Sequence, residues 1–303
     1  MRTIFTLVWI GLILDGTRLL TTALPVPVLL IHGIDTKRGS NDFWTLDPAR
    51  FEQLISALKA AGYRTLDQSE LNRALLGTLP AGESSRRFVF TVDDGLSSVA
   101  SRIVPRFDQA GFTGFFFVCP GLGPPQHLDG PSIKELSHHH VVGAHGHTHV
   151  TLSPTHRPSA SRRRADEIER IRDELEQSRS ALEATVDHPV TFMAYPRGEY
   201  DSTTLELARA AGYDLAFTTD IGYVDASTLR MEIPRLQILQ DMPVSMILAF
   251  LGTPERERTR RLVLESALFL LLSCYLIGTR TRRPPENLLR EAPLPVNPSS
   301  ANS

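Results

Sequence analysis

The chain has 303 residues, of which 42% are hydrophobic and 22% charged, and its formal net charge is −2. This length suits one catalytic domain of about 200–250 residues with extra segments at the ends. The nearly balanced charge gives no basic field and argues against nucleic acid as a partner. Its two cysteines, Cys119 and Cys274, suggest neither a disulfide framework nor a thiolate metal cluster.

Residues 1–24 predict a signal peptide or N-terminal anchor. Arg2 precedes the apolar run from Ile4 to Leu14, and small residues follow, with cleavage expected after Ala23. This run is short for a membrane span, and a buried N-terminal helix is the alternative. We therefore expect an exported protein, located in the periplasm or cell envelope or outside the cell.

Seven short apolar runs between residues 25 and 252 predict strands that are buried on both faces. The runs are Val28–Ile31, Phe88–Val92, Phe115–Val118, Val141–Ala144, Thr191–Ala194, Leu215–Thr218 and Leu236–Leu239. Continuous rather than alternating apolar character is typical of a parallel sheet.

Amphipathic stretches separate these runs and predict helices near residues 51–61, 99–110, 165–185 and 205–211. Strands that alternate with helices indicate βα units. Seven strands favour a distorted (β/α)7 barrel, with an open α/β sheet as the alternative. In both architectures function belongs at the carboxyl ends of the strands.

The stretch from Thr36 to Leu46 is a predicted loop that carries Phe43 and Trp44. These two side chains could offer an aromatic platform to a sugar ring. We favour the alternative, in which they seal one end of the barrel.

Residues 253–303 predict a separate basic and apolar segment. Arginines flank the stretch from Leu262 to Gly278, and a tail rich in Pro, Asn and Ser follows, which we expect to be disordered. Seventeen residues is the short limit for a membrane helix. Membrane association and burial against the barrel both remain open for this stretch.

His145 and His149 are candidate metal ligands because they lie four residues apart. On a helical turn, two such imidazoles converge on one ion, whereas in a strand they would be about 13 Å apart. A solvated His-rich turn is the alternative, because the pair alone implies no third ligand.

Asp93 and Asp94 follow the predicted strand 88–92 and supply carboxylates. Neighbouring residues at a strand end point in different directions, so one can bind a metal while the other acts as a base. With His145 and His149, one aspartate completes a His₂Asp site that has open positions, the form of catalytic zinc. Cobalt or nickel would suit the same donors.

Two motifs resemble those of the polysaccharide deacetylase family, also called the NodB-homology or carbohydrate esterase 4 family. The segment Thr91–Gly95 resembles its first motif, and His145–His149 followed by Leu152 resembles its second. The resemblance runs from about Val26 to Leu251. Tyr195–Gly198 is most similar to the branch that deacetylates poly-β-1,6-N-acetylglucosamine.

The resemblance implies a NodB-like fold and metal-dependent removal of acetyl groups from an N-acetylated glycan. It implies that Asp94, His145 and His149 hold a divalent metal and that Asp93 is the general base. The backbone N–H of Arg197 would then face the oxyanion. His147 is interpreted as a supporting or structural residue.

Two positions depart from the family pattern. Ala194 stands where the family usually has an arginine that orients the base, and the run Leu236–Leu239 lacks the usual acid histidine. We hypothesise that Arg235 replaces the first and His32 the second. Two other functions stay open: a catalytically silent glycan-binding or envelope-scaffold protein, and a hydrolase of a small non-sugar amide.

Overall fold

The computed structural model describes residues 24–35, 43–153, 161–257, 259–260 and 264. The chain divides into two compact units, Met1–Arg258 and Thr259–Ser303, and the first of them is described below. The predicted signal segment and, apart from Leu264, the apolar stretch Leu262 to Gly278 lie outside the described residues. Among the helices that are described, none has the length and apolar character needed to cross a membrane.

All seven predicted runs form strands, and several short strands are added. The strands are β1 (Val26–Ile31), β2 (Gly33–Ile34), β3 (Thr45–Leu46), β4 (Arg64–Thr65), β5 (Arg87–Val92), β6 (Gly114–Val118), β7 (Val141–Ala144), β8 (Phe192–Ala194), β9 (Leu215–Phe217), β10 (Tyr223–Val224) and β11 (Leu236–Gln237). Parallel pairing joins β11, β1, β5, β6, β7, β8 and β9 in that order. β10 pairs antiparallel with β1, β4 pairs with β5, and β2 with β3.

The segment that leads into β11 brings the two ends of the sheet together. The Thr218 N–H after β9 donates to the Ile233 carbonyl at 2.8 Å, and the Ile238 N–H donates to the Leu30 carbonyl of β1 at 2.8 Å. One irregular segment therefore contacts both the first and the last main strand. The predicted distorted (β/α)7 barrel is confirmed.

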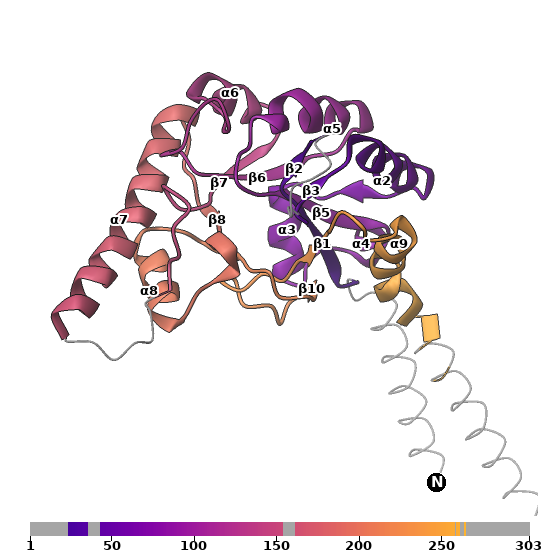
Figure 1. Cartoon of the computed structure of the whole chain (residues 1–303). Helices are drawn as coiled ribbons and strands as arrows, with labels where there is room; N and C mark the ends of the chain where they lie inside the picture. Colours follow the sequence, from indigo (N-terminus) through magenta and orange to yellow (C-terminus); the bar gives the residue numbers. More distant parts are fainter. Residues whose placement is uncertain (1–23, 36–42, 154–160, 258, 261–263, 265–303) are drawn as a thin grey trace, which may run out of the picture. The chain divides into compact units, whose positions relative to one another are not determined.

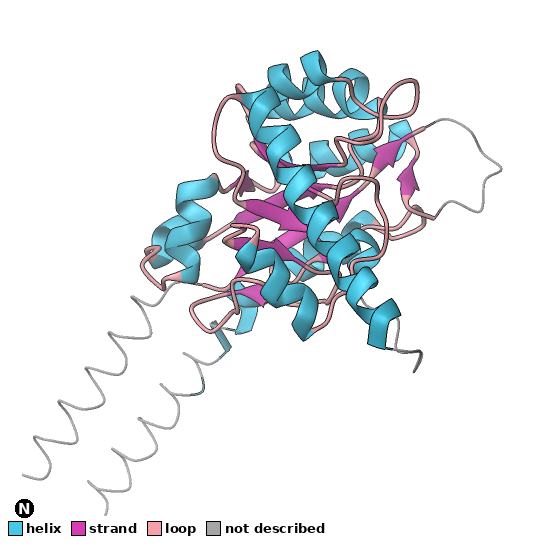
Figure 2. Ribbon diagram, turned by 90° about the vertical axis from the view of Figure 1, so that its left-hand side faces the viewer, coloured by secondary structure: helices cyan, strands magenta, loops and turns pink. Residues whose placement is uncertain are grey.

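Helices surround the sheet (Figures 1 and 2). They are α2 (Pro48–Ala60), α3 (Gln68–Leu75), α4 (Ala81–Ser84), α5 (Val104–Ala110), α6 (Gly130–Leu136), α7 (Ser161–Val186), α8 (Ser202–Ala210) and α9 (Val244–Leu251). A π-helical turn, η1 (Val99–Ile103), precedes α5, and a 3₁₀ turn, η2 (Pro196–Gly198), follows β8. The four predicted helices are present, although the second begins as η1.

Alternate residues of each strand enter two different cores, which explains why the runs are continuously apolar. In β6, Phe116 and Val118 pack in a cluster that includes residues of α2, α5 and α7. Phe115 and Phe117 belong to the other cluster, which includes Phe217 of β9 and apolar residues of α3. Both faces of the sheet are therefore dry, and polar side chains gather where the strands end.

Phe43 and Trp44 do not seal the barrel as predicted. Their exposed fractions are 59% and 46%. The Trp44 ring instead lies beside His32, with the ring centroids 5.8 Å apart. Residues 43–46 therefore leave these aromatic side chains facing solvent near the carboxyl end of β1.

Candidate functional site

The predicted site residues meet at the carboxyl ends of the strands. Asp93 and Asp94 follow β5, His145 follows β7, and Arg235 directly precedes β11. In a parallel sheet these ends share one edge, and the short loops beyond them can place polar groups there while the strands stay buried.

Asp94, His145 and His149 form the one group of at least three potential metal-ligating side chains found among the described residues. The His145 Nε2 lies 3.4 Å and the His149 Nε2 3.3 Å from the Asp94 Oδ1. Bonds of about 2.0–2.1 Å to one tetrahedral ion would place two ligand atoms about 3.3 Å apart. Within the part of the chain that the structure describes, the Asp94 Oδ1 is buried without a hydrogen-bond partner. These residues therefore fit a divalent metal ion.

The segment between the two histidines is not the helical turn that the spacing suggested. Gly146 and His149 have positive φ angles of 70° and 62°, and residues 145–149 form an irregular loop. This loop brings the imidazole centroids of His145 and His149 to 5.0 Å. The convergence of the rings was expected, but left-handed backbone produces it, and the helical interpretation was wrong.

Helix α7 holds this loop through Glu174, a residue that no sequence motif marks. The Glu174 carboxylate accepts hydrogen bonds from the His147 and Thr148 N–H groups, at 2.8 and 2.9 Å, and from the Thr148 hydroxyl at 2.5 Å. One turn later, the Ser178 hydroxyl donates to the Gly146 carbonyl at 2.8 Å. Four hydrogen bonds from one helix therefore fix the backbone between the two histidines.

The ring of His145 is oriented from its far side. Its Nδ1 lies 2.9 Å from the Ala194 carbonyl, to which an Nδ1–H can donate. That tautomer leaves the Nε2 lone pair directed at Asp94, as a metal ligand requires. The Cys119 thiol donates to the His145 carbonyl at 3.0 Å and so acts as a buried support.

Asp93 faces Arg235 rather than the histidine pair. The Arg235 Nη1 and Nη2 lie 2.7 and 2.9 Å from the two Asp93 carboxylate oxygens, and both side chains are nearly fully buried. Burial alone would raise the pKa of Asp93, but the Arg235 guanidinium and His145 outweigh it and hold the pKa below its ordinary value. Asp93 is therefore an ionised carboxylate within a dry site.

The different surroundings of Asp93 and Asp94 come from a turn, and not from the strand pleat that the sequence suggested. β5 ends at Val92, and Asp94 has a φ of 72°. Burial opposes ionisation of Asp94, but the neighbouring rings of His145 and His149 outweigh it and hold its pKa well below the ordinary range. Asp93 still lies only 3.9 Å from the His145 Nε2, so both carboxylates border the same small space.

The remaining predicted residues also lie near this space. His32 follows β1, and its Nδ1 is buried without a hydrogen-bond partner in the described part of the chain. Burial lowers the pKa of His32 against the opposing effects of Asp93 and Asp94. Arg197 lies in η2 with a φ of 61° and an exposed side chain.

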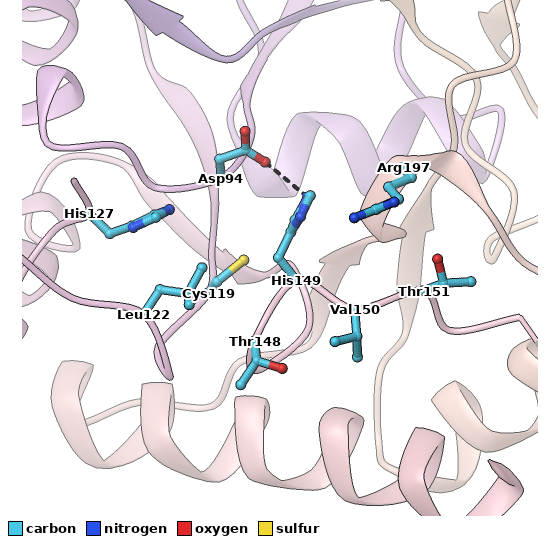
Figure 3. Close-up of a pocket in the computed structure, with 9 residues that line it drawn as sticks. All are labelled: Asp94, Cys119, Leu122, His127, Thr148, His149, Val150, Thr151 and Arg197. Atoms are coloured by element: carbon cyan, nitrogen blue, oxygen red, sulfur yellow. Dashed lines mark ion pairs between the residues drawn. The ribbon is translucent and has the colours of Figure 1, made fainter.

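A pocket of about 500 Å³ opens beside Asp94 and His149 (Figure 3). Its other lining residues are Cys119, Leu122, His127, Thr148, Val150, Thr151 and Arg197. Figure 3 shows His127 and Arg197 entering it from opposite sides. His127, Thr148 and Thr151 were not recognised from the sequence, because single residues in loops carry no spacing signal.

Comparison with known proteins places this site in a family. A family model for polysaccharide deacetylases matches residues 81–216, a range that includes Asp93, Asp94, His145, His149 and Arg197. The chain is 22% identical over 228 residues to YxkH of Bacillus subtilis, a proposed polysaccharide deacetylase; the match covers 75% of this chain and 76% of YxkH.

Solved structures share the fold. The Streptococcus pyogenes deacetylase PplD, in complex with acetate, matches with a TM-score of 0.65 and 23% identity, over 76% of this chain and 99% of PplD. IcaB from Ammonifex degensii matches with a TM-score of 0.62 and 20% identity, over 76% of this chain and 98% of IcaB. The barrel is thus NodB-like, as expected. Residues 81–216 thus match the polysaccharide deacetylase family, whose members are hydrolases that act on non-peptide carbon–nitrogen bonds.

Proposed function

We propose that the protein is a metal-dependent deacetylase that releases acetate from an N-acetylglucosamine-containing polysaccharide. The observation that carries this proposal is the group Asp94, His145 and His149 beside an arginine-paired Asp93. If Asp93 had only a structural role, its pairing with Arg235 would be sufficient. A structural metal site would have all its coordination positions filled by protein ligands, with none open to solvent. Here an ionised carboxylate borders a ligand group that opens into a pocket.

Asp94, His145 and His149 would hold the ion, with zinc favoured and cobalt or nickel as alternatives. When bound, the ion would polarise the acetamide carbonyl and acidify a water molecule. The family match and the donor set support this assignment; the identity of the metal is part of the proposal.

Asp93 would take a proton from the attacking water. Its carboxylate is ionised and oriented through the two-point contact with Arg235, so it is ready to accept a proton without first losing one. Arg235 is itself fixed, because its Nε donates to the Thr218 carbonyl at 2.7 Å. The guanidinium also lies over Phe117, 5.8 Å from the ring centroid.

The backbone N–H of Arg197 would stabilise the negative charge that develops on the acetamide oxygen. Hydrogen bonds fix the backbone here: the Gly198 N–H donates to the Tyr195 carbonyl at 2.9 Å. The Tyr195 hydroxyl donates to the Met231 carbonyl at 3.0 Å. This support keeps the Arg197 amide in place while its side chain remains exposed.

The leaving amine needs a proton, and His32 is our candidate to supply it. Because its pKa is lowered by burial, His32 is neutral at pH 7 and would first have to receive a proton, for which Asp93 is the available source. This route returns Asp93 to its ionised form at the end of the cycle.

We also propose export and membrane association, on the sequence evidence of residues 1–24 and 262–278. Cell fractionation tests both. Full-length protein in the soluble cytoplasm would contradict them, whereas release from the membrane on deletion of residues 262–303 would support the second.

One experiment tests the function. Purified full-length protein is loaded with zinc, cobalt or nickel, and acetate release is measured from β-1,4 and β-1,6 N-acetylglucosamine oligomers and from small amides. The proposal expects metal-dependent release from an oligomer. Oligomer binding without acetate release would indicate the silent glycan-binding protein, and release from small amides alone would indicate the other hydrolase.

A further inference from the structure

The side chain of Arg197 has no part in the proposed reaction, which uses only its backbone N–H. It lines the pocket beside the metal ligands, and Figure 3 shows its guanidinium directed toward His149. Among the described residues, no carboxylate pairs with this guanidinium and no side-chain hydrogen bond involves it. It is therefore a positive charge available to a ligand in the pocket.

The pocket offers little negative charge to balance Arg197. Among the described residues, Asp94 is its one acidic lining residue, and the proposed metal would use that charge. Glu174, which lies behind the loop, is occupied by three hydrogen bonds from His147 and Thr148. A pocket with a bound divalent ion and a free arginine is electropositive, and such a cleft favours anionic groups.

The polar groups of the pocket also suit an anion. The Thr151 hydroxyl belongs to the lining, and His127 enters from the wall opposite Arg197 (Figure 3). Hydroxyl and guanidinium groups donate hydrogen bonds that the oxygens of a carboxylate or a phosphate can accept. A guanidinium can bind a carboxylate or a phosphate at two points. Among the described lining residues there is no Phe, Tyr or Trp, and the polar groups named above are the ones that a ligand would meet.

We infer that the Arg197 side chain binds an anionic substituent, a carboxylate or a phosphate, on the N-acetylated glycan and makes the protein selective for acidic chains. This inference rests on the proposed function and adds the substrate class to it. The left-handed backbone of Arg197 aids selectivity, because a φ of 61° followed by a Gly198 φ of 70° fixes where the side chain leaves the chain. Arg197 would thus serve through its N–H in the reaction and through its side chain in choosing the substrate.

The test compares three sets of matched oligosaccharides: neutral N-acetylglucosamine chains, chains with a carboxylate on the neighbouring sugar, and chains with a phosphate there. The native protein should show a higher kcat/KM for at least one acidic chain than for the neutral chain. Arg197→Gln should lower the ratio of kcat/KM for the acidic chain to kcat/KM for the neutral chain about 3- to 30-fold. This is the range between the effect of an exposed ion pair and that of a two-point contact, about 3- to 30-fold. Arg197→Lys should retain part of the ratio, because it keeps the charge but loses the planar fork.

Arg64→Gln is the matched control. Arg64 is exposed on β4, where it pairs in register with Arg87. Arg87 begins β5, so Arg64 lies near the end of the sheet opposite to the one that carries Asp93. Its loss should leave the ratio unchanged. The preference for the acidic chain should also fall as ionic strength rises, because an exposed charge is screened.

Binding without turnover separates this inference from the proposed function. Dissociation constants for the same chains are measured by calorimetry on the native protein and on Arg197→Gln. If no chain is deacetylated but acidic chains bind through Arg197, the proposed function fails and the inference stands. If chains are deacetylated and Arg197→Gln shows the same ratio of kcat/KM for acidic over neutral chains as the native protein, the inference is wrong and the function stands. Equal affinity of native protein and Arg197→Gln for all chains also overturns it.

Discussion

The Arg235 guanidinium holds the Asp93 carboxylate at two points, with distances of 2.7 and 2.9 Å between the paired atoms. Arg235 reaches Asp93 from the irregular segment that closes the barrel, and it also donates to the Thr91 hydroxyl at 3.2 Å. Ala194, at the end of β8, leaves the position free from which the family usually supplies its arginine. The pair therefore links closure of the barrel to the orientation of the proposed base.

This link predicts separate effects on rate and on metal binding. Arg235→Lys keeps a positive charge but loses the two-point contact, so turnover should fall about 10- to 100-fold, the usual loss for a supporting residue. Metal content should stay near one ion per chain, because Arg235 contacts none of the proposed ligands. Kinetics and metal analysis on the same preparation check this.

Arg235→Ala tests the same contact through stability. An unpaired buried carboxylate should cost about 3–5 kcal/mol of unfolding free energy, measured by urea denaturation. Asp93→Asn combined with Arg235→Ala should recover part of that loss, because no buried charge then lacks its partner. Native-like turnover in Arg235→Lys would show that the pair does not orient the base.

Much of the fold could be predicted because the information is local. Runs such as Phe115–Val118 are apolar on both faces, and this pattern has few alternatives to a buried parallel strand. The ligand types Asp94, His145 and His149 were likewise visible from their spacing and from the known motifs. The way in which residues 233–238 contact both the first and the last main strand could not be predicted, because no local sequence pattern indicates such a contact.

The detailed site could not be predicted because it depends on unusual backbone and on distant contacts. Five described residues other than glycine have a positive φ, and Asp94, His149 and Arg197 are three of them. Sequence rules assign such residues to strands or helices, which is why residues 145–149 were misread as a helical turn. Glu174 reaches the loop from 26 residues further along the chain, a separation without any spacing rule.

Glu174 should control the affinity for metal through the backbone of the loop. Glu174→Ala removes the acceptor for two N–H groups and one hydroxyl, so the loop should lose its left-handed geometry and metal affinity should fall about 10- to 100-fold. Titration with zinc monitored by calorimetry measures this. Glu176→Ala, an exposed position on the same helix, is the control, and equal zinc affinity in the two variants would contradict the role of Glu174.

His140 should make stability depend on pH. Its ring is buried against Phe107 and Phe116, and its Nδ1 accepts from the Gly114 N–H at 3.3 Å. Burial lowers its pKa from 6.5, although Asp108 opposes this. Because the folded pKa is the lower one, the unfolded chain binds the proton first, and stability present above pH 6.5 is lost as pH falls toward the folded pKa.

Urea denaturation between pH 7.5 and 5 tests the role of His140, with an expected loss of about 1.4 kcal/mol for each unit by which the folded pKa is lowered. His140→Gln should flatten this part of the profile. His138→Gln should leave it unchanged, because the His138 side chain is 56% exposed. The same slope in His140→Gln and the native protein would assign the pH dependence to other groups.

Asp93 and Asp94 should have separable roles although they are neighbours. Asp94 faces the two histidines at 3.3 and 3.4 Å, whereas Asp93 is held by Arg235. Asp94→Ala should therefore lose metal together with activity, because two imidazoles leave an incomplete set of ligands. Asp93→Asn should keep the metal and the affinity for glycan, because Asp93 is not one of the proposed ligands. Its turnover rate should fall roughly 10²–10⁴-fold, the usual contribution of a positioned general base. Both variants should be prepared with the same amount of added zinc and compared by metal analysis and acetate release. Since Asp93 also lies 3.9 Å from the His145 Nε2, the opposite assignment has a clear signature: a metal-free Asp93→Asn protein, or an Asp94→Ala protein that stays fully loaded, would reverse the two roles.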